Sequence, residues 1–496
     1  MRMPAWISRY ARRALLFIVA LAVVLLGLRA WDSQRGPPLR PWHLVVPEEL
    51  RADALDRADW PRYLAAEDSV FATVRTKVTD ALQAEDRVPS NRYFAGSPLY
   101  PGRFARDWNR SFVLEPAGEP AGAVVLLHGL TDAPYSLRHV AATYRDRGWV
   151  AIGIRLPAHG TVPAALTDVT WKDWMAATRL AVREARRHVG PSRPLQLVGY
   201  SNGGALAVKY ALDALEDMRL PRPDRVVLIS PMVGITAFAR FAGLAGLPAL
   251  LPRFAKAAWL GLVPEFNPFK YNSFPVNAAR QSFRLTMALQ QQIQRQAATG
   301  LLAKLPPVLT FQSVVDSTVS VRAVMTALYA RLPEQGSEIV LFDINRNSRV
   351  GPLLGTAAQT ALERVLPPAP RAFRTVVVTN AGPNRDDVVE RSTEAGTVEE
   401  RQRPLNLPYP RDVYSLSHIA LPFPVTDGLY GLDPDPAEDF GARLGTIAVR
   451  GERGVLAVSP DALLRLSSNP FFPSVLARVE EGIGPAPGPG RKGVPP

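Results

Sequence analysis

The most informative part of the sequence is Leu195-Gln196-Leu197-Val198-Gly199-Tyr200-Ser201-Asn202-Gly203-Gly204. It begins as an apolar run typical of a buried strand, turns at Gly-x-Ser-x-Gly, and continues as helix-type sequence. A strand that turns at once into a helix at a serine is a nucleophile elbow, and its glycines are required because larger side chains would collide in so tight a turn. Ser201 is therefore the predicted nucleophile, and the alternative is a purely structural turn.

Outward from this stretch, short apolar runs alternate with helix-type segments. Strands are expected at residues 123–127, 150–154, 225–230, 308–312 and 338–342, and helices at 134–147, 170–188 and near 321–332. Strand–helix units of this length are typical of a mostly parallel sheet with helices on both faces. The sequence thus predicts an α/β fold.

A serine nucleophile needs a base, and the base needs an orienting carboxylate. The chain has six histidines, and His418 alone follows the last predicted strand of the alternating series. The base comes last in the chain order serine, acid, histidine. His418 is therefore the expected base, with a structural histidine as the alternative.

The expected acid is Asp316, which follows the strand at residues 308–312 and would emerge at the edge of the sheet that carries the elbow. Asp343, at the end of the next strand, is the competing candidate, and a helix-capping role for Asp316 fits the same position. The backbone amides of Leu130 and Asn202 are the predicted oxyanion donors. His128, next to Leu130's loop, is expected to be structural.

Together these residues resemble the α/β-hydrolase superfamily over residues 110–232, 306–343 and the region of His418. His128-Gly129 and the loop at residues 155–160 look like the monoacylglycerol lipase and serine aminopeptidase branch. The resemblance implies hydrolysis of a small-molecule ester or lipid substrate through an acyl-enzyme, with no cofactor and no metal. A peptidase, thioesterase or acyltransferase would use the same triad, and a non-catalytic, membrane-tethered binding protein is a different class. The wide gap between Asp343 and His418 departs from the family pattern.

Composition excludes some other functions. Cysteine is absent, which rules out disulfides, thiolate metal sites and cysteine nucleophiles. The net charge is +13, but it is concentrated in residues 1–40 and 232–305 instead of along a recognition face with interleaved aromatics. We therefore expect no nucleic-acid partner. The oligomeric state does not follow from the sequence.

The N-terminal region predicts a membrane partner. Four arginines precede an uncharged, apolar run at residues 14–28. Basic residues ahead of such a run favour a signal anchor, with everything after it on the periplasmic or extracellular side. A cleaved signal peptide is the alternative.

These observations divide the chain into eight parts. Residues 1–31 form the signal anchor or signal peptide, 32–109 a linker and N-terminal helical extension, and 110–231 and 306–343 the two parts of the core. Residues 232–305 form a mainly helical cap, and residues 344–411 a second insertion with one strand-like run at 375–379. Residues 412–481 form the C-terminal part of the core with its histidine, and 482–496 a disordered tail. Large apolar and basic residues share the cap. The first interpretation is that the apolar residues cover the site and the basic ones are solvated, and the alternative is that the cap faces a membrane.

Overall fold

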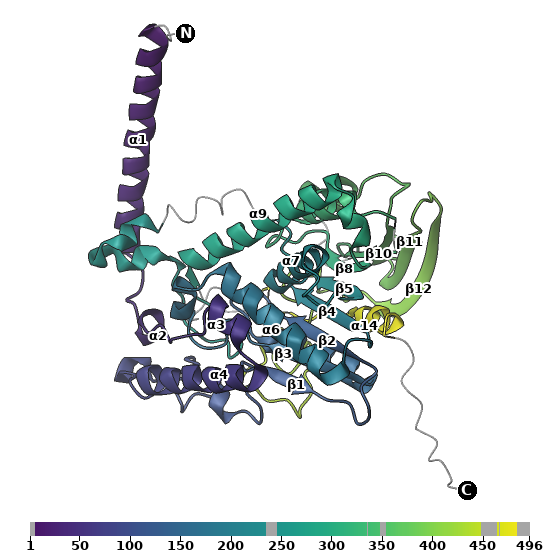
Figure 1. Ribbon diagram of the computed structural model, residues 1–496, viewed down its shortest axis with the longest axis horizontal. Helices are drawn as coiled ribbons and strands as arrows, with labels where there is room; N and C mark the ends of the chain where they lie inside the picture. The colour runs from purple at the N-terminus through teal and green to yellow at the C-terminus, as the bar shows by residue number, and fades with distance from the viewer. Residues whose placement is uncertain are drawn as a thin grey trace.

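Apolar runs of the sequence become the strands of one large sheet. A computed structural model describes residues 5–234, 246–334, 336–347, 354–447, 464–465 and 467–483. Its ten-stranded sheet has the order β1-β3-β2-β4-β5-β8-β9-β10-β11-β12 (Figure 1). The strands are β1 (Phe112–Leu114), β2 (Gly122–Leu127), β3 (Trp149–Ile154), β4 (Leu195–Tyr200), β5 (Arg225–Ile229), β8 (Val308–Ser313), β9 (Glu338–Phe342), β10 (Arg374–Asn380), β11 (Asp387–Thr393) and β12 (Glu400–Pro408).

The seven strands from β3 to β10 in this order run parallel, and β1, β11 and β12 are antiparallel to their neighbours. The central strands are buried on both faces, so their side chains alternate between two cores. In β2, Val125 and Leu127 join the core beneath α6 and α7, whereas Val124 and Leu126 join the core beneath α5 and α14. The expected α/β fold with helices on both faces is confirmed.

Helices cover the sheet, and further helices precede it in the chain. They are α1 (Ala5–Ser33), α2 (Pro41–Leu44), α3 (Ala52–Arg57), α4 (Trp60–Val74), α5 (Arg138–Asp146), α6 (Trp171–Val189), α7 (Asn202–Glu216), α9 (Val276–Ala298), α10 (Val321–Ala323), α11 (Thr356–Gln359), α12 (Ala361–Val365) and α14 (Phe472–Glu481). Figure 1 shows α1 projecting away from the body of the molecule. Within the described residues, the segment Arg12–Ser33 is the one helix long and apolar enough to cross a bilayer. No part of its most apolar stretch is buried in the rest of the molecule.

The cap region connects β5 to β8. Its described part contains the 3₁₀ turns η7 (Leu247–Leu250) and η8 (Pro252–Ala258), an antiparallel pair β6 (Trp259–Gly261) and β7 (Phe274–Pro275), and α9. Residues 235–245 of the predicted cap lie outside the described residues. Contacts join η7 and η8 to α1, so this part of the cap lies at the base of the projecting helix.

The second insertion differs from the expectation. Residues 344–411 were expected to contain one strand, at 375–379, but the structure has three strands there, and β10 extends the main sheet by pairing parallel to β9. The sequence does not reveal β12 because this edge strand is mostly exposed and carries charged residues and prolines, which is common at sheet edges. Of the tail expected to be disordered, residues 484–496 lie outside the described part.

Candidate active site

Ser201 occupies the sharp turn between β4 and α7. Its backbone has φ 54° and ψ −114°, a strained conformation for a residue with a side chain. A Cβ atom on Gly203 would lie 1.8 Å from the carbonyl oxygen of Leu127, and one on Gly199 would lie 2.3 Å from the carbonyl oxygen of Gly203. The glycines of the Gly-x-Ser-x-Gly stretch are thus imposed by contact with backbone, as the sequence predicts.

Asp316 and His418 come from segments far apart in the chain and form a hydrogen bond. His418 Nδ1 donates to Asp316 Oδ2 over 2.8 Å. The other carboxylate oxygen, Oδ1, accepts from the amides of Thr318 at 2.8 Å and Val319 at 3.0 Å. Burial alone would raise the pKa of Asp316, but the charge and hydrogen bond of His418 and these two amides hold it below its ordinary value. The carboxylate is therefore built to remain ionised.

A cavity of about 330 Å³ contains both Ser201 and His418 in its lining. The Tyr200 ring lies 5.3 Å from the His418 ring, centroid to centroid, and the Tyr200 hydroxyl donates to the His418 carbonyl oxygen over 3.3 Å. The hydrogen bonds found in the described residues include none between Ser201 and His418. Such nucleophile–base bonds are often long in unliganded enzymes.

The competing candidates lie in other surroundings. Asp343 accepts hydrogen bonds from Arg346, from Thr379 and from the amide of Ile344. The remaining histidines contact other groups: His43 contacts Ser273, His139 contacts Asp427, His188 contacts Glu184, and His128 and His159 are buried against backbone carbonyls. His418 is the one histidine among the described residues that line the Ser201 cavity. Within the described chain, Asp316 forms a hydrogen bond with this histidine and Asp343 does not.

The expected oxyanion donors lie on either side of the nucleophile. Neither the Leu130 amide nor the Asn202 amide donates a hydrogen bond to another described residue. Leu130 lines the cavity, and Asn202 is the first residue of α7, where backbone N–H groups lack intrahelical partners. Thr131, directly after Leu130, has φ 62°, so this loop holds a strained conformation beside the site.

His128 fastens this loop to its neighbour, as expected of a structural residue. Its Nδ1 donates to the Gly129 carbonyl oxygen over 2.9 Å, and its Nε2 accepts from the Leu156 amide over 3.0 Å. Burial and the nearby His159 keep the pKa of His128 well below its ordinary value, so the ring is neutral. This neutral tautomer satisfies both backbone groups.

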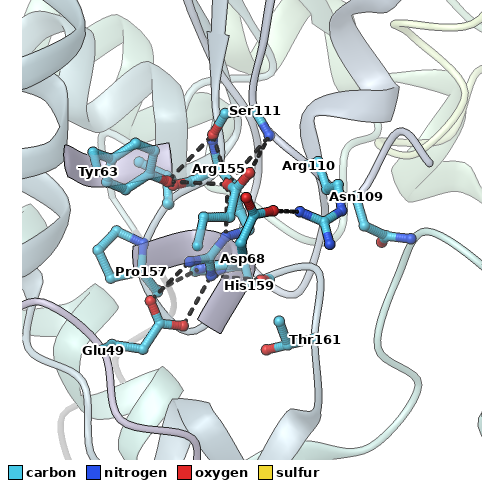
Figure 2. A network of polar contacts seen from close by, with 12 residues as sticks. Glu49, Tyr63, Asp68, Asn109, Arg110, Ser111, Arg155, Pro157, His159 and Thr161 are labelled. Carbon is cyan, nitrogen blue, oxygen red and sulfur yellow. Dashed lines mark hydrogen bonds and ion pairs between the residues drawn. The ribbon is translucent and has the colours of Figure 1, made fainter. Parts of the chain in front are cut away.

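The N-terminal extension supports the same region through Arg155, at the end of β3 (Figure 2). Arg155 is buried, and it binds both carboxylate oxygens of Glu49, at 2.8 and 2.9 Å. Its Nε donates to Glu67 of α4 over 3.0 Å, and Tyr63 of α4 donates to the Arg155 carbonyl oxygen over 2.6 Å. These contacts fix the loop that carries Leu156, and hence the partner of His128.

Two basic residues of the cavity were not predicted from the sequence as site residues. Lys270, from the loop before β7, and Arg465, from the C-terminal region, both line the cavity that contains Ser201. Lys270 counts only as one of many basic residues in the cap when the sequence is read alone. No local pattern marks it, because its place depends on how the cap packs on the core.

The described part of the chain has other cavities of similar volume. A cavity of about 410 Å³ lies beside α4, lined by Phe71, Arg92, Tyr93 and Arg110, and contains none of the predicted site residues. No group of three or more acidic residues or histidines in the described part of the chain could hold a metal ion.

Comparison with known proteins finds a family that this chain resembles. Residues 118–344 match the family model described as serine aminopeptidase, S33. Over 186 residues the chain is 27% identical to the thermostable monoacylglycerol lipase of Bacillus sp. (strain H-257), a match that covers 37% of this chain and 68% of that protein.

Two solved structures are also similar. A chain from the work on the metagenome-derived lipolytic enzymes LipS and LipT is 21% identical with a TM-score of 0.37, covering 52% of this chain and 95% of that one. A soluble variant of monoglyceride lipase from Saccharomyces cerevisiae, in complex with a substrate analog, is 14% identical with a TM-score of 0.36, covering 47% of this chain and 81% of that one. The family match and the lipase relative show that the chain is similar to the α/β-hydrolase superfamily, in the branch of serine aminopeptidases and monoacylglycerol lipases.

Proposed function

We propose that the protein is a serine hydrolase that cleaves carboxylic esters, with Ser201, His418 and Asp316 as its catalytic triad. The observation that carries the proposal is the cavity shared by Ser201, strained at its elbow, and by His418, whose Nδ1 binds Asp316 at 2.8 Å. The similarity to a monoacylglycerol lipase supports an ester as substrate.

In this mechanism Ser201 Oγ attacks the ester carbonyl carbon while His418 Nε2 takes the hydroxyl proton. Asp316 accepts from His418 Nδ1 and stabilises the imidazolium that forms. The amides of Leu130 and Asn202 donate to the oxyanion. His418 then returns the proton to the leaving alcohol, which produces an acyl-enzyme on Ser201. Water, activated by His418, releases the acid and restores the serine.

A peptidase, thioesterase or acyltransferase would use the same residues, and the aminopeptidase description of the family keeps an amide substrate in view. The apolar lining contributed by Leu130, Met232, Phe274 and Ile419 suits an acyl chain and supports the ester. The test compares para-nitrophenyl esters of rising chain length with para-nitroanilides of amino acids. We expect ester turnover with a chain-length optimum, and faster cleavage of the anilides would assign a peptidase instead.

We further propose that α1 anchors the protein in a membrane, with the catalytic domain on the non-cytoplasmic side and the cap against the bilayer. The 22 residues of Arg12–Ser33 correspond to about 33 Å of helix, enough for the hydrocarbon core. Arg29 donates to the Trp259 carbonyl oxygen, and Lys256 Nζ donates to the Gly36 carbonyl oxygen over 2.8 Å, so the cap is joined to the end of α1. Leu250 and Leu251 beside this joint are 81% and 60% exposed, which is suited to lipid contact.

A further inference from the structure

The lining of the Ser201 cavity is asymmetric in charge. Two of its described residues, Lys270 and Arg465, are basic, and none is acidic. Asp316 lies behind His418, and the hydrogen bonds already described stabilise its negative charge. A cavity that served only a neutral acyl ester would have no use for two cations beside apolar walls, since a partly buried charge is costly when unpaired.

Lys270 is held in place by its two aromatic neighbours. The Phe269 ring stacks on Tyr135 with 4.0 Å between centroids. The Tyr271 amide donates to the Thr131 carbonyl oxygen over 2.7 Å, and its hydroxyl accepts from the Thr161 amide over 2.7 Å. Lys270 is therefore positioned by rigid contacts directly beside the loop that carries Leu130.

The Lys270 ammonium group makes no hydrogen bond or ion pair within the described ranges. Asp132 is the carboxylate that acts on it electrostatically, but these two charges do not form an ion pair, and the Asp132 carboxylate is already engaged by the Ser136 hydroxyl. Arg465 donates to Thr318 and likewise has no ion pair in this part of the chain. Burial lowers the pKa of Lys270, with Asp132 opposing this shift. An anion in the cavity would supply the missing partner.

Resting on the proposed ester hydrolysis, we propose that the natural substrate is an ester that also carries an acidic group, a carboxylate or a phosphate, which binds Lys270 with the help of Arg465. The apolar wall takes the hydrocarbon part, and the ester carbonyl lies at Ser201. Lys270 is thus a specificity residue that separates acidic amphiphilic esters from neutral ones. A charge-assisted hydrogen bond in such a site corresponds to about ten- to a hundredfold in kcat/KM.

The test uses two pairs of esters that differ only in the acid. Para-nitrophenyl hexanoate is compared with mono-para-nitrophenyl adipate, which has a carboxylate on the acyl side. Glycerol monohexanoate is compared with its phosphate, which has the anion on the alcohol side. We expect the anionic member of at least one pair to have the higher kcat/KM by about tenfold or more. The pair that shows the preference identifies whether the anion of the substrate lies on the acyl side or on the alcohol side of the ester.

Substitution then assigns the preference to Lys270. Lys270→Met should reduce the ratio of anionic to neutral kcat/KM to about one, and Lys270→Arg should retain most of it. Lys304→Met, an equal change of charge at an exposed position away from the cavity, should leave the ratio unchanged. Neutral esters preferred in both pairs, or the same ratio in Lys270→Met as in the wild type, would overturn the proposal. A merely structural role opposite Asp132 would lower both members equally.

A binding measurement keeps this question separate from hydrolysis. In the Ser201→Ala protein, mono-para-nitrophenyl adipate and the glycerol monohexanoate phosphate are titrated by calorimetry, each with and without Lys270→Met. If Lys270→Met weakens the binding of either anionic ester by about tenfold or more, the proposal is supported. This holds even if no ester is turned over, because a lack of turnover would defeat only the proposed function. Equal binding with and without Lys270, or no binding of either anion, defeats the proposal itself.

Discussion

Asp316 has each of its carboxylate oxygens engaged by different partners, and this predicts the effect of its amide. In Asp316→Asn, the amides of Thr318 and Val319 would hold the side-chain oxygen at the Oδ1 position, so the NH₂ group would face His418 Nδ1. Two donors cannot pair, and His418 would take the tautomer that cannot accept the serine proton. We expect kcat to fall by about 10⁴.

The fold should tolerate this change. Gln312 Nε2 donates to Asp316 Oδ2 over 2.9 Å, and Gln312 Oε1 is buried without a partner among the described residues, so a flip of the Gln312 amide restores a hydrogen bond. Thermal melting should show a folded Asp316→Asn protein. Asp343→Asn is the control and should keep kcat within a few-fold. A strong loss in Asp343→Asn with activity retained in Asp316→Asn would reverse the assignment of the acid.

At this scale the sequence predicts what depends on local pattern. Ser201 follows from its elbow, and Asp316 and His418 follow from chain order and the ends of predicted strands; the structure brings the latter two into hydrogen-bond contact. Lys270 could not be predicted, because its position depends on the stacking of Phe269 on Tyr135 and on the bond from Tyr271 to Thr131. Such contacts join segments that are distant in sequence.

Among the elements, α4 has an unexpected role in supporting the site. Its Glu67 is buried against Arg155, and its carboxylate accepts from Arg155 Nε over 3.0 Å and from the Ser111 hydroxyl over 2.8 Å. Glu67→Gln should lower the free energy of unfolding by about 3 kcal/mol, measured by urea denaturation, because a neutral amide weakens these buried charge-assisted hydrogen bonds. Activity should fall with it, since Arg155 positions the loop that His128 fastens.

Asp68, the next residue on α4, provides a matched control for this substitution. It pairs with Arg110 at 2.5 Å, but its side chain is 72% exposed. Exposed ion pairs contribute about 0–1 kcal/mol, so Asp68→Asn should be nearly neutral. Equal stability of Glu67→Gln and Asp68→Asn would show that the extension does not support the core through this contact.

Elements with strong apolar pattern were predictable, and exposed ones were not. Strands β2, β3, β4, β5, β8 and β9 were expected because their buried faces require continuous apolar runs. The edge strand β12 was missed because most of its residues are exposed to solvent, so it carries no continuous apolar run. Residues 344–411 therefore look like an insertion in the sequence although the structure adds them to the sheet.

For the whole molecule, the absence of cysteine allows the orientation on the membrane to be measured directly. A single Leu250→Cys in the full chain can be labelled with an environment-sensitive fluorophore and placed in vesicles. We expect quenching by a lipid-borne quencher at this position. Met218→Cys, 90% exposed just beyond the end of α7, should not be quenched. Equal quenching at both positions would contradict contact between the cap and the bilayer.

The same preparation tests the anchor. Full-length protein should remain with membranes after a carbonate wash, because an apolar helix of this length is held by the hydrocarbon core. A soluble form that begins near Trp31 would instead identify a cleaved signal peptide. A reporter at the C-terminus that works only in the cytoplasm would contradict the proposed side of the membrane.

The role of Ser201 as nucleophile can be tested by intact-mass measurement after reaction with a fluorophosphonate. We expect one adduct on the wild-type protein, mapped by peptide sequencing to Ser201, and none on a folded Ser201→Ala protein. Ester hydrolysis should fall in parallel by about 10⁶. An adduct on folded Ser201→Ala, or an unreactive wild-type protein, would contradict the account.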